Sequence, residues 1–376
     1  MISPFAAFFY AAFNPVLLFL VHGPATRWLT AFFLPHMVLP PGLFLKAVRV
    51  AGSVSFVGGT AVFLACAGQV YFHQILRRGP ALGGLYRWIR HPQYLALALT
   101  GLGLAILWPR FLTIVLWTVM VGLYYLLAKD EERRMVNQFG DPYRRYMART
   151  GMFLPRWAEQ TANRLPFPRS PAIRPLLGLV LLAVAAVGGA FALRAYTIAR
   201  LPLWAEGRVT AMTILPADAI MLEHRMAAVL ELPQVKSRLA KSPGPILVYL
   251  VPQQYVMQGM IADTGPQWRL YEHHQTLAMI ADWIFHPFRH LQGGHLMMHH
   301  SMAGATRTAP GGIVRRLIFL RVDSSKSMST PALLFGLNTT RDPQFFADVD
   351  IHNLILLDIQ PLGPGTGWGR VPTPMF

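Results

Sequence analysis

The residues best suited to chemistry lie in two short polar segments that flank a pair of apolar stretches. Residues 90–94 read Arg-His-Pro-Gln-Tyr, while residues 129–146 begin with Lys-Asp-Glu-Glu-Arg-Arg and end in Asp-Pro-Tyr-Arg-Arg-Tyr. Both ends of a transmembrane hairpin lie on the same side of the membrane, so the two segments are predicted to meet there. Charged and hydroxylic side chains at a membrane face indicate a functional site.

Two acidic residues, Glu131 and Glu132, stand in a segment otherwise crowded with arginine. Helix-dipole and positive-inside preferences both favour basic side chains at a cytoplasmic helix end, so these carboxylates need another reason to be there. Pairing with an arginine such as Arg90 is the structural explanation, and holding a cationic or hydroxyl-bearing ligand is the functional one. Tyr143 and Tyr146 share a helical face and offer aromatic surface for a sulfonium.

The elements that must position these residues are membrane helices. The chain has 376 residues, of which 53% are hydrophobic and only 14% charged, and its mean hydropathy of +0.38 is typical of a membrane protein. Each apolar stretch is near the length that crosses a hydrocarbon core of ~30 Å. Five spans are predicted, at residues 3–21, 48–73, 93–108, 111–128 and 175–195.

The net charge of +17 is distributed unevenly along the chain. Residues 196–376 hold 15 Lys and Arg against 12 Asp and Glu, so most of the positive charge belongs to residues 1–195. There it lies in short segments between apolar spans, which indicates the positive-inside pattern rather than nucleic-acid binding. Segments 74–92 and 129–174 are therefore expected to be cytoplasmic and residues 196–376 extracytoplasmic. A bacterial inner membrane, with a periplasmic C-terminal domain, fits this Arg-rich and Cys-poor chain.

The sequence thus predicts a polytopic α-helical membrane protein with a C-terminal extracytoplasmic α+β domain. Its predicted parts are a membrane core (1–160), a cytoplasmic Pro/Arg linker (161–174), a fifth transmembrane helix (175–196) and the α+β domain (197–376). Apolar runs that favour strands alternate in that domain with helical stretches at 217–240 and 270–302. The predicted strands are 246–251, 314–322, 332–337 and 354–359.

Seven of the 13 histidines fall between residues 273 and 300. His286 and His290 are four residues apart, as are His295 and His299, the spacing that lets two imidazoles share one metal on a helix face. Nearby methionines would favour copper, although zinc also suits imidazole. A polar, partly buried helix face without metal is the alternative interpretation.

The set Arg-His-Pro-x-Tyr, Glu-Glu, Phe-Gly-x-x-Tyr-x-x-Tyr and Phe-Leu-Pro resembles the isoprenylcysteine carboxyl methyltransferase and phospholipid N-methyltransferase superfamily. The resemblance covers about residues 45–157. It implies a membrane enzyme that transfers a methyl group from S-adenosylmethionine at the cytoplasmic face. A membrane lipid or isoprenoid-type molecule is the expected acceptor, and the outer domain is expected to recognise a membrane protein partner.

Carried over residue by residue, the resemblance assigns His91, Tyr94 and Glu132 to the cofactor, with Tyr143 and Tyr146 nearby. Arg90 and Glu131 are the candidates for placing the acceptor. The chain has Ala96 where the family usually has glycine, a change that narrows a helix contact or the substrate path.

Two alternative functions stay open at this point. Some sterol reductases share this membrane core and use a nicotinamide cofactor. The second alternative is that the core is a non-catalytic assembly or sensor scaffold. In that case the histidine-rich outer domain carries the function.

Overall fold

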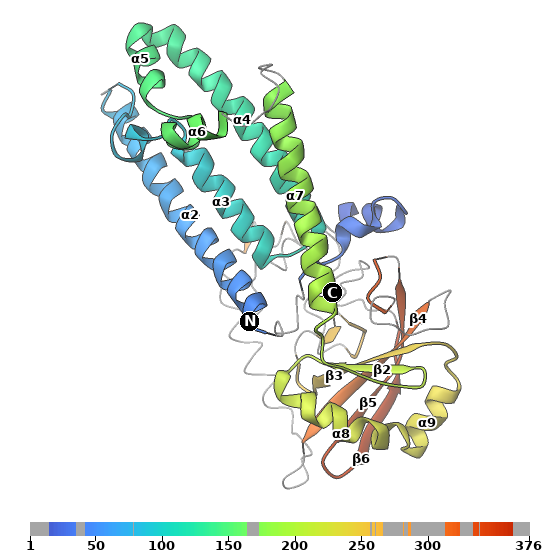
Figure 1. Cartoon of the computed structure of the whole chain (residues 1–376). Helices are drawn as coiled ribbons and strands as arrows, with labels where there is room; N and C mark the ends of the chain where they lie inside the picture. The colour runs from blue at the N-terminus through green and yellow to red at the C-terminus, as the bar shows by residue number, and fades with distance from the viewer. Residues whose placement is uncertain are drawn as a thin grey trace. The chain divides into compact units, whose positions relative to one another are not determined.

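The computed structural model describes residues 15–34, 42–77, 79–163, 173–255, 258–259, 261–265, 281, 285–286, 313–323, 334–337 and 339–363. The chain divides into two compact units (Figure 1). Residues 42–193 form a helical unit, and residues 1–41 together with 194–376 form a unit that contains a β-sheet.

The helical unit is built from long apolar helices and two short polar ones. Among the described residues, α2, α4 and α7 are long and apolar enough to cross a membrane, and α3 is a shorter apolar helix. The helix bounds are α2 Leu43–Ile75, α3 Pro92–Leu107, α4 Phe111–Phe139, α5 Asp141–Arg149, α6 Arg156–Asn163 and α7 Ile173–Ile198. Four predicted spans therefore coincide with helices. The remaining predicted span, 3–21, lies largely outside the described residues, although residues 15–22 are helical.

Small residues bring α2 and α3 into close contact. A Cβ atom added to Gly103 would lie 2.4 Å from the backbone nitrogen of Phe56 and 2.6 Å from the carbonyl oxygen of Gly52. A Cβ on Gly59 would lie 2.8 Å from the carbonyl oxygen of Ala96, whose own methyl group is buried. Glycine lets membrane helices approach this closely. The close packing on α2 fixes the position of α3 and therefore of the residues at its start.

The fourth helix continues well past the end of its apolar stretch at residue 128. Its polar extension is held in helical form by two surface ion pairs, from Asp130 to Arg133 (2.6 Å) and from Asp130 to Arg134 (3.1 Å). The helix ends at Gly140, whose φ of +59° suits glycine at a helix terminus. The extension carries Glu131 and Glu132 beyond the apolar span.

A six-stranded sheet, in the order β1 to β6, forms the described core of the second unit. Neighbouring strands are antiparallel except β2 and β3, which are parallel and joined through α8 and α9. The strands are β1 Leu203–Glu206, β2 Val209–Thr213, β3 Ile246–Pro252, β4 Val314–Asp323, β5 Thr340–Asp350 and β6 Ile355–Pro361. The helices of this unit are α8 Ala219–Leu230 and α9 Pro233–Ala240, with short 3₁₀ turns at η1 Arg27–Thr30 and η3 Pro216–Asp218. A further 3₁₀ turn, η2 Gly84–Arg87, belongs to the helical unit.

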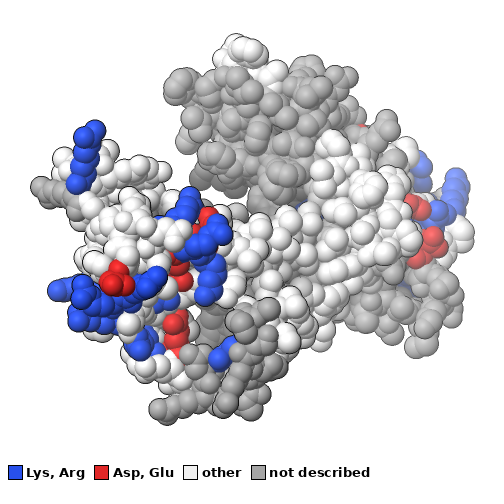
Figure 2. All heavy atoms as spheres, turned by 90° about the horizontal axis from the view of Figure 1, so that it is seen from above, with Lys and Arg blue, Asp and Glu red and all other residues white. Residues whose placement is uncertain are grey.

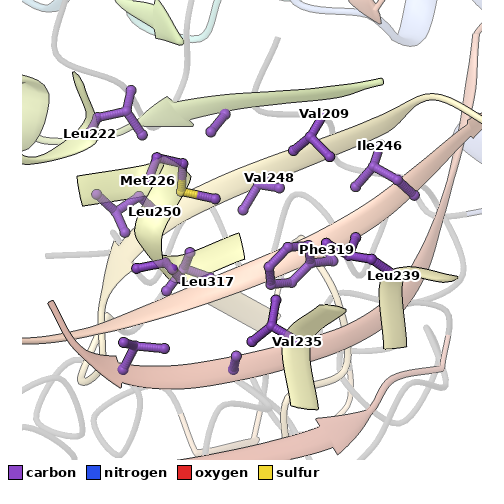
Figure 3. Packing of buried hydrophobic residues seen from close by; sticks show 14 of the residues in the cluster. Val209, Leu222, Met226, Val235, Leu239, Ile246, Val248, Leu250, Leu317 and Phe319 are labelled. Carbon is purple, nitrogen blue, oxygen red and sulfur yellow. The ribbon is translucent and has the colours of Figure 1, made fainter. Parts of the chain in front are cut away.

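The sheet buries apolar side chains on both faces. On one face, residues of α8 and α9 such as Met226 and Val235 pack with Val248 and Phe319 of the strands (Figure 3). A second buried cluster includes Tyr249 and other side chains of alternating position along the same strands. Burial on both faces explains the near-continuous apolar runs in β3 and β4.

The described part of this unit departs from the predicted elements in several places. The predicted strand at 332–337 is wrong for residues 334–337, which form a turn whose Leu334 and Phe335 are buried. The predicted helix at 217–240 is divided into α8 and α9 by Pro233, because proline cannot continue a helix. Strands β1, β2 and β5 were not predicted, and the predicted helix at 270–302 lies largely outside the described residues.

Candidate active site

The first residues of α3 and the polar extension of α4 form one cluster of charged and aromatic side chains. His91 precedes α3, Pro92 is its first residue, and Tyr94 lies within the first turn. Glu131 and Glu132 of α4 each place a carboxylate oxygen near the His91 ring. In Figure 2, Lys and Arg gather beside Asp and Glu over part of the face shown, next to a broad area without charge.

Arg90 joins three segments of the helical unit. Its Nε donates to Oε1 of Glu132 at 2.6 Å, and its Nη1 donates to the carbonyl oxygens of Met147 (3.1 Å) and Thr150. Only 10% of the Arg90 side chain and 6% of the Glu132 side chain are exposed. This buried ion pair therefore ties the start of α3 to α4 and to the end of α5.

The backbone supports the same junction. The amides of Arg90 and His91 donate to the carbonyl oxygens of Gly151 (2.8 Å) and Met152 (3.1 Å), and the Gly151 amide donates to Trp88 (3.3 Å). Residues 88–91 and 151–152 thus lie side by side as a short parallel pairing.

His91 is buried between the two carboxylates of α4. Its Nδ1 lies 3.5 Å from Oε2 of Glu131, and its Nε2 lies 3.5 Å from Oε1 of Glu132. These distances fit electrostatic attraction better than strong hydrogen bonds. Burial lowers the pKa of His91, but the two carboxylates outweigh this effect and the pKa is raised overall. The site therefore favours an imidazolium, with one N–H toward each carboxylate.

We expect the stabilisation that His91 provides to decrease as the pH rises. The folded protein holds the proton more tightly than the unfolded chain, so this stabilisation is fully present below the ordinary pKa of about 6.5 and is lost as the pH passes through the raised value. Thermal unfolding of the wild type and His91→Gln in detergent, from about pH 5.5 to about pH 9, measures the effect. The gap in Tm should be widest at acid pH. A gap that widens with pH would contradict this, and His224→Gln, on the exposed side of α8, is the control.

Glu131 differs from Glu132 in its exposure. Its side chain is 37% exposed, and its Oε2 accepts a hydrogen bond of 3.3 Å from the Tyr94 hydroxyl. The Tyr94 ring stacks on His91 (centroids 5.6 Å apart, 21° between planes) and on Tyr124 of α4 (5.3 Å, 16°). A partly exposed carboxylate beside a row of stacked rings can bind a cation by charge and by the ring faces.

Tyr143 and Tyr146 lie together on α5, as their spacing predicts, with ring centroids 5.5 Å apart. The Tyr146 hydroxyl donates to the carbonyl oxygen of Tyr86 at 2.6 Å, and the Tyr143 side chain is buried. Burial raises the pKa of Tyr146 to about 12, so its phenol stays protonated and acts as a donor. The hydrogen bond of Tyr146 therefore ties α5 to Tyr86 of the η2 turn.

Two residues of the cluster were given no role from the sequence. Tyr124 lies in an apolar span, where its spacing alone did not distinguish it from other interfacial aromatics. Phe153 belongs to the Phe-Leu-Pro motif, and its ring packs against His91 with centroids 6.0 Å apart and 47° between planes.

The predicted metal site cannot be located in the structure. His286 is described and exposed, whereas His290, His295 and His299 lie outside the described residues. Within the described part of the chain, no group of three or more His, Cys, Asp or Glu residues is arranged to hold a metal ion. Copper or zinc binding in the outer domain stays a prediction.

Residues 42–142 match the family model of phospholipid methyltransferases. The match spans α2, α3 and α4 and confirms the superfamily that the motifs indicate. The match indicates a membrane methyltransferase domain in this part of the chain and lends no support to the reductase or scaffold alternatives. No curated protein and no solved structure matches the chain.

Proposed function

We propose that the helical unit transfers a methyl group from S-adenosylmethionine to a lipid-soluble acceptor at the cytoplasmic membrane face. The observation that carries this proposal is the partly exposed Glu131 carboxylate beside the stacked rings of Tyr94 and Tyr124, in a segment matching methyltransferases.

The described residues fit a sulfonium cofactor. Glu131 offers negative charge, and the faces of Tyr94 and Tyr124 offer the quadrupole that attracts a desolvated cation. Glu132 has less capacity for a ligand, because Arg90 already occupies its Oε1. We therefore infer that Glu131 contacts the cation. Glu132 and Arg90 hold the start of α3 against α4 and α5, and they affect the acceptor only through this arrangement.

The chemistry asks for alignment rather than strong activation. S-adenosylmethionine supplies a methyl group that is already activated on sulfur. The protein must align donor and acceptor and exclude water, which the buried His91 and the packed Phe153 favour. A carboxylate acceptor needs no base, whereas an amine or hydroxyl does. The raised pKa of His91 favours its protonated form, which leaves Oε2 of Glu131 as the candidate proton acceptor, although the contact with His91 lowers the pKa of that carboxyl.

The acceptor is inferred from the surroundings of the cluster. Leu99 and Leu104 of α3 and Leu123 and Leu127 of α4 are exposed, so the helices near the cluster present an apolar surface. A membrane lipid or isoprenoid-type molecule can therefore approach from the bilayer. We further propose a bacterial inner membrane, with the C-terminal domain periplasmic and available to a membrane protein partner.

Calorimetry with S-adenosylmethionine on the full-length protein in detergent tests this proposal. Glu131→Gln removes a charge-assisted contact and should weaken binding by roughly 10–100-fold. The matched control is Glu231→Gln, an exposed carboxylate on the sheet unit, which should bind like the wild type. Wild-type protein that binds NADPH instead would contradict the proposal and favour a reductase.

A further inference from the structure

We propose that Glu159 is a positioning residue of the methyltransferase site, because its carboxylate shapes the loop that holds Phe153 against His91. The role of Glu159 in methyl transfer rests on the proposed function. Its role in shaping the loop rests only on the hydrogen bonds that its carboxylate makes.

The Glu159 carboxylate is the centre of a tight loop. Its Oε1 accepts the backbone amides of Met152 (2.5 Å), Phe153 (3.1 Å) and Leu154 (3.5 Å). Three consecutive amides that converge on one oxygen form a concave anion site, here filled by a side chain of the same protein. The carboxylate thus defines the backbone path of residues 152–154.

Gly151 shows how closely the loop is folded. A Cβ atom at this position would lie 1.8 Å from the Leu154 carbonyl oxygen and 2.9 Å from Cδ of Glu159. No side chain fits there, so the loop closes on Glu159 only with glycine at its start.

The loop is joined directly to the candidate site. The carbonyl oxygens of Gly151 and Met152 accept the amides of Arg90 and His91, and the Phe153 ring packs on the imidazole. Glu159 therefore acts on His91 through the backbone and through Phe153, without touching the imidazole itself. A loop held in this way closes one side of His91 and keeps water from it.

Hydrogen exchange on the full-length protein tests the contact without any ligand. Glu159→Ala should speed exchange of the amides of residues 152–154 by at least about tenfold, because they lose their acceptor. Glu159→Gln keeps an acceptor oxygen and should stay within about threefold of the wild type. Gln160→Ala, on the exposed side of the same helix, is the control. Unchanged exchange in Glu159→Ala would overturn the proposal.

Affinity for S-adenosylmethionine tests the link to the site. Misplacing the loop should weaken binding by roughly tenfold in Glu159→Ala, with rescue in Glu159→Gln. If Glu159 acts through Phe153, the double variant Glu159→Ala/Phe153→Ala should bind within about twofold of Phe153→Ala alone. If the losses of affinity in the two single variants multiply in the double variant, Glu159 does not act through Phe153. Absence of binding in the wild type would contradict the proposed function, whereas exchange would still decide the role of Glu159 in the loop.

Discussion

Replacing Arg90 by alanine is expected to abolish methyl transfer and to lower the free energy of unfolding by about 3–5 kcal/mol. The substitution leaves the carboxylate of Glu132 buried without its 2.6 Å partner, and it removes the donor to the carbonyl oxygens of Met147 and Thr150. An unpaired buried charge costs far more than the attraction of an exposed pair contributes. Thermal unfolding and activity of the full-length protein in detergent measure both effects.

The matched control is Arg133→Ala. Arg133 pairs with Asp130 at the same distance of 2.6 Å, but its side chain is 75% exposed, so its loss should cost under about 1 kcal/mol. Arg90→Lys should also fail, since lysine lacks the planar fork that reaches a carboxylate and two carbonyls together. Equal stability of Arg90→Ala and Arg133→Ala would contradict a structural role for the buried pair.

The second large effect is expected in the sheet, where Asp348→Ala should destabilise the second unit by about 3–5 kcal/mol. Arg316 of β4 makes two hydrogen bonds with Asp348 of β5, Nε to Oδ1 at 2.7 Å and Nη2 to Oδ2 at 2.6 Å. Its guanidinium also donates to Gln258 (2.9 Å) and lies 4.0 Å from the Phe346 ring centroid. Only 7% of the Arg316 side chain and 2% of the Asp348 side chain are exposed.

The control uses the same two strands. Arg321 of β4 and Asp342 of β5 pair at 3.0 Å with side chains 44% and 53% exposed, so Asp342→Ala should cost under about 1 kcal/mol. Hydrogen exchange of the β4 and β5 amides in the full-length protein reports the stability of this unit separately from that of the helical unit. Comparable exchange in the two variants would show that burial of the Arg316–Asp348 pair does not matter.

Hydropathy alone located the four apolar helices α2, α3, α4 and α7, because a long apolar stretch is visible in composition. The end of α4 was missed, since ion pairs within a helix extend it without any apolar signal. Strand β5 was missed for a related reason. Its charged residues and Pro343 look unlike a strand, yet Asp348 is neutralised by Arg316 and the register shift near Pro343 accommodates the proline.

The sequence by itself predicted that the two polar segments meet, because both ends of a helical hairpin must lie on the same side, and the contacts among Arg90, His91, Tyr94, Glu131 and Glu132 confirm it. It also determined the superfamily, through the order and spacing of its motifs. Only the tertiary structure decided which carboxylate pairs with Arg90 and which is left partly exposed, since adjacent residues on a helix point about 100° apart and their partners come from distant segments. The carboxylate of Glu159 and the ring of Phe153 entered the site for the same reason: hydrogen bonds and packing between segments leave no periodic signal in the chain.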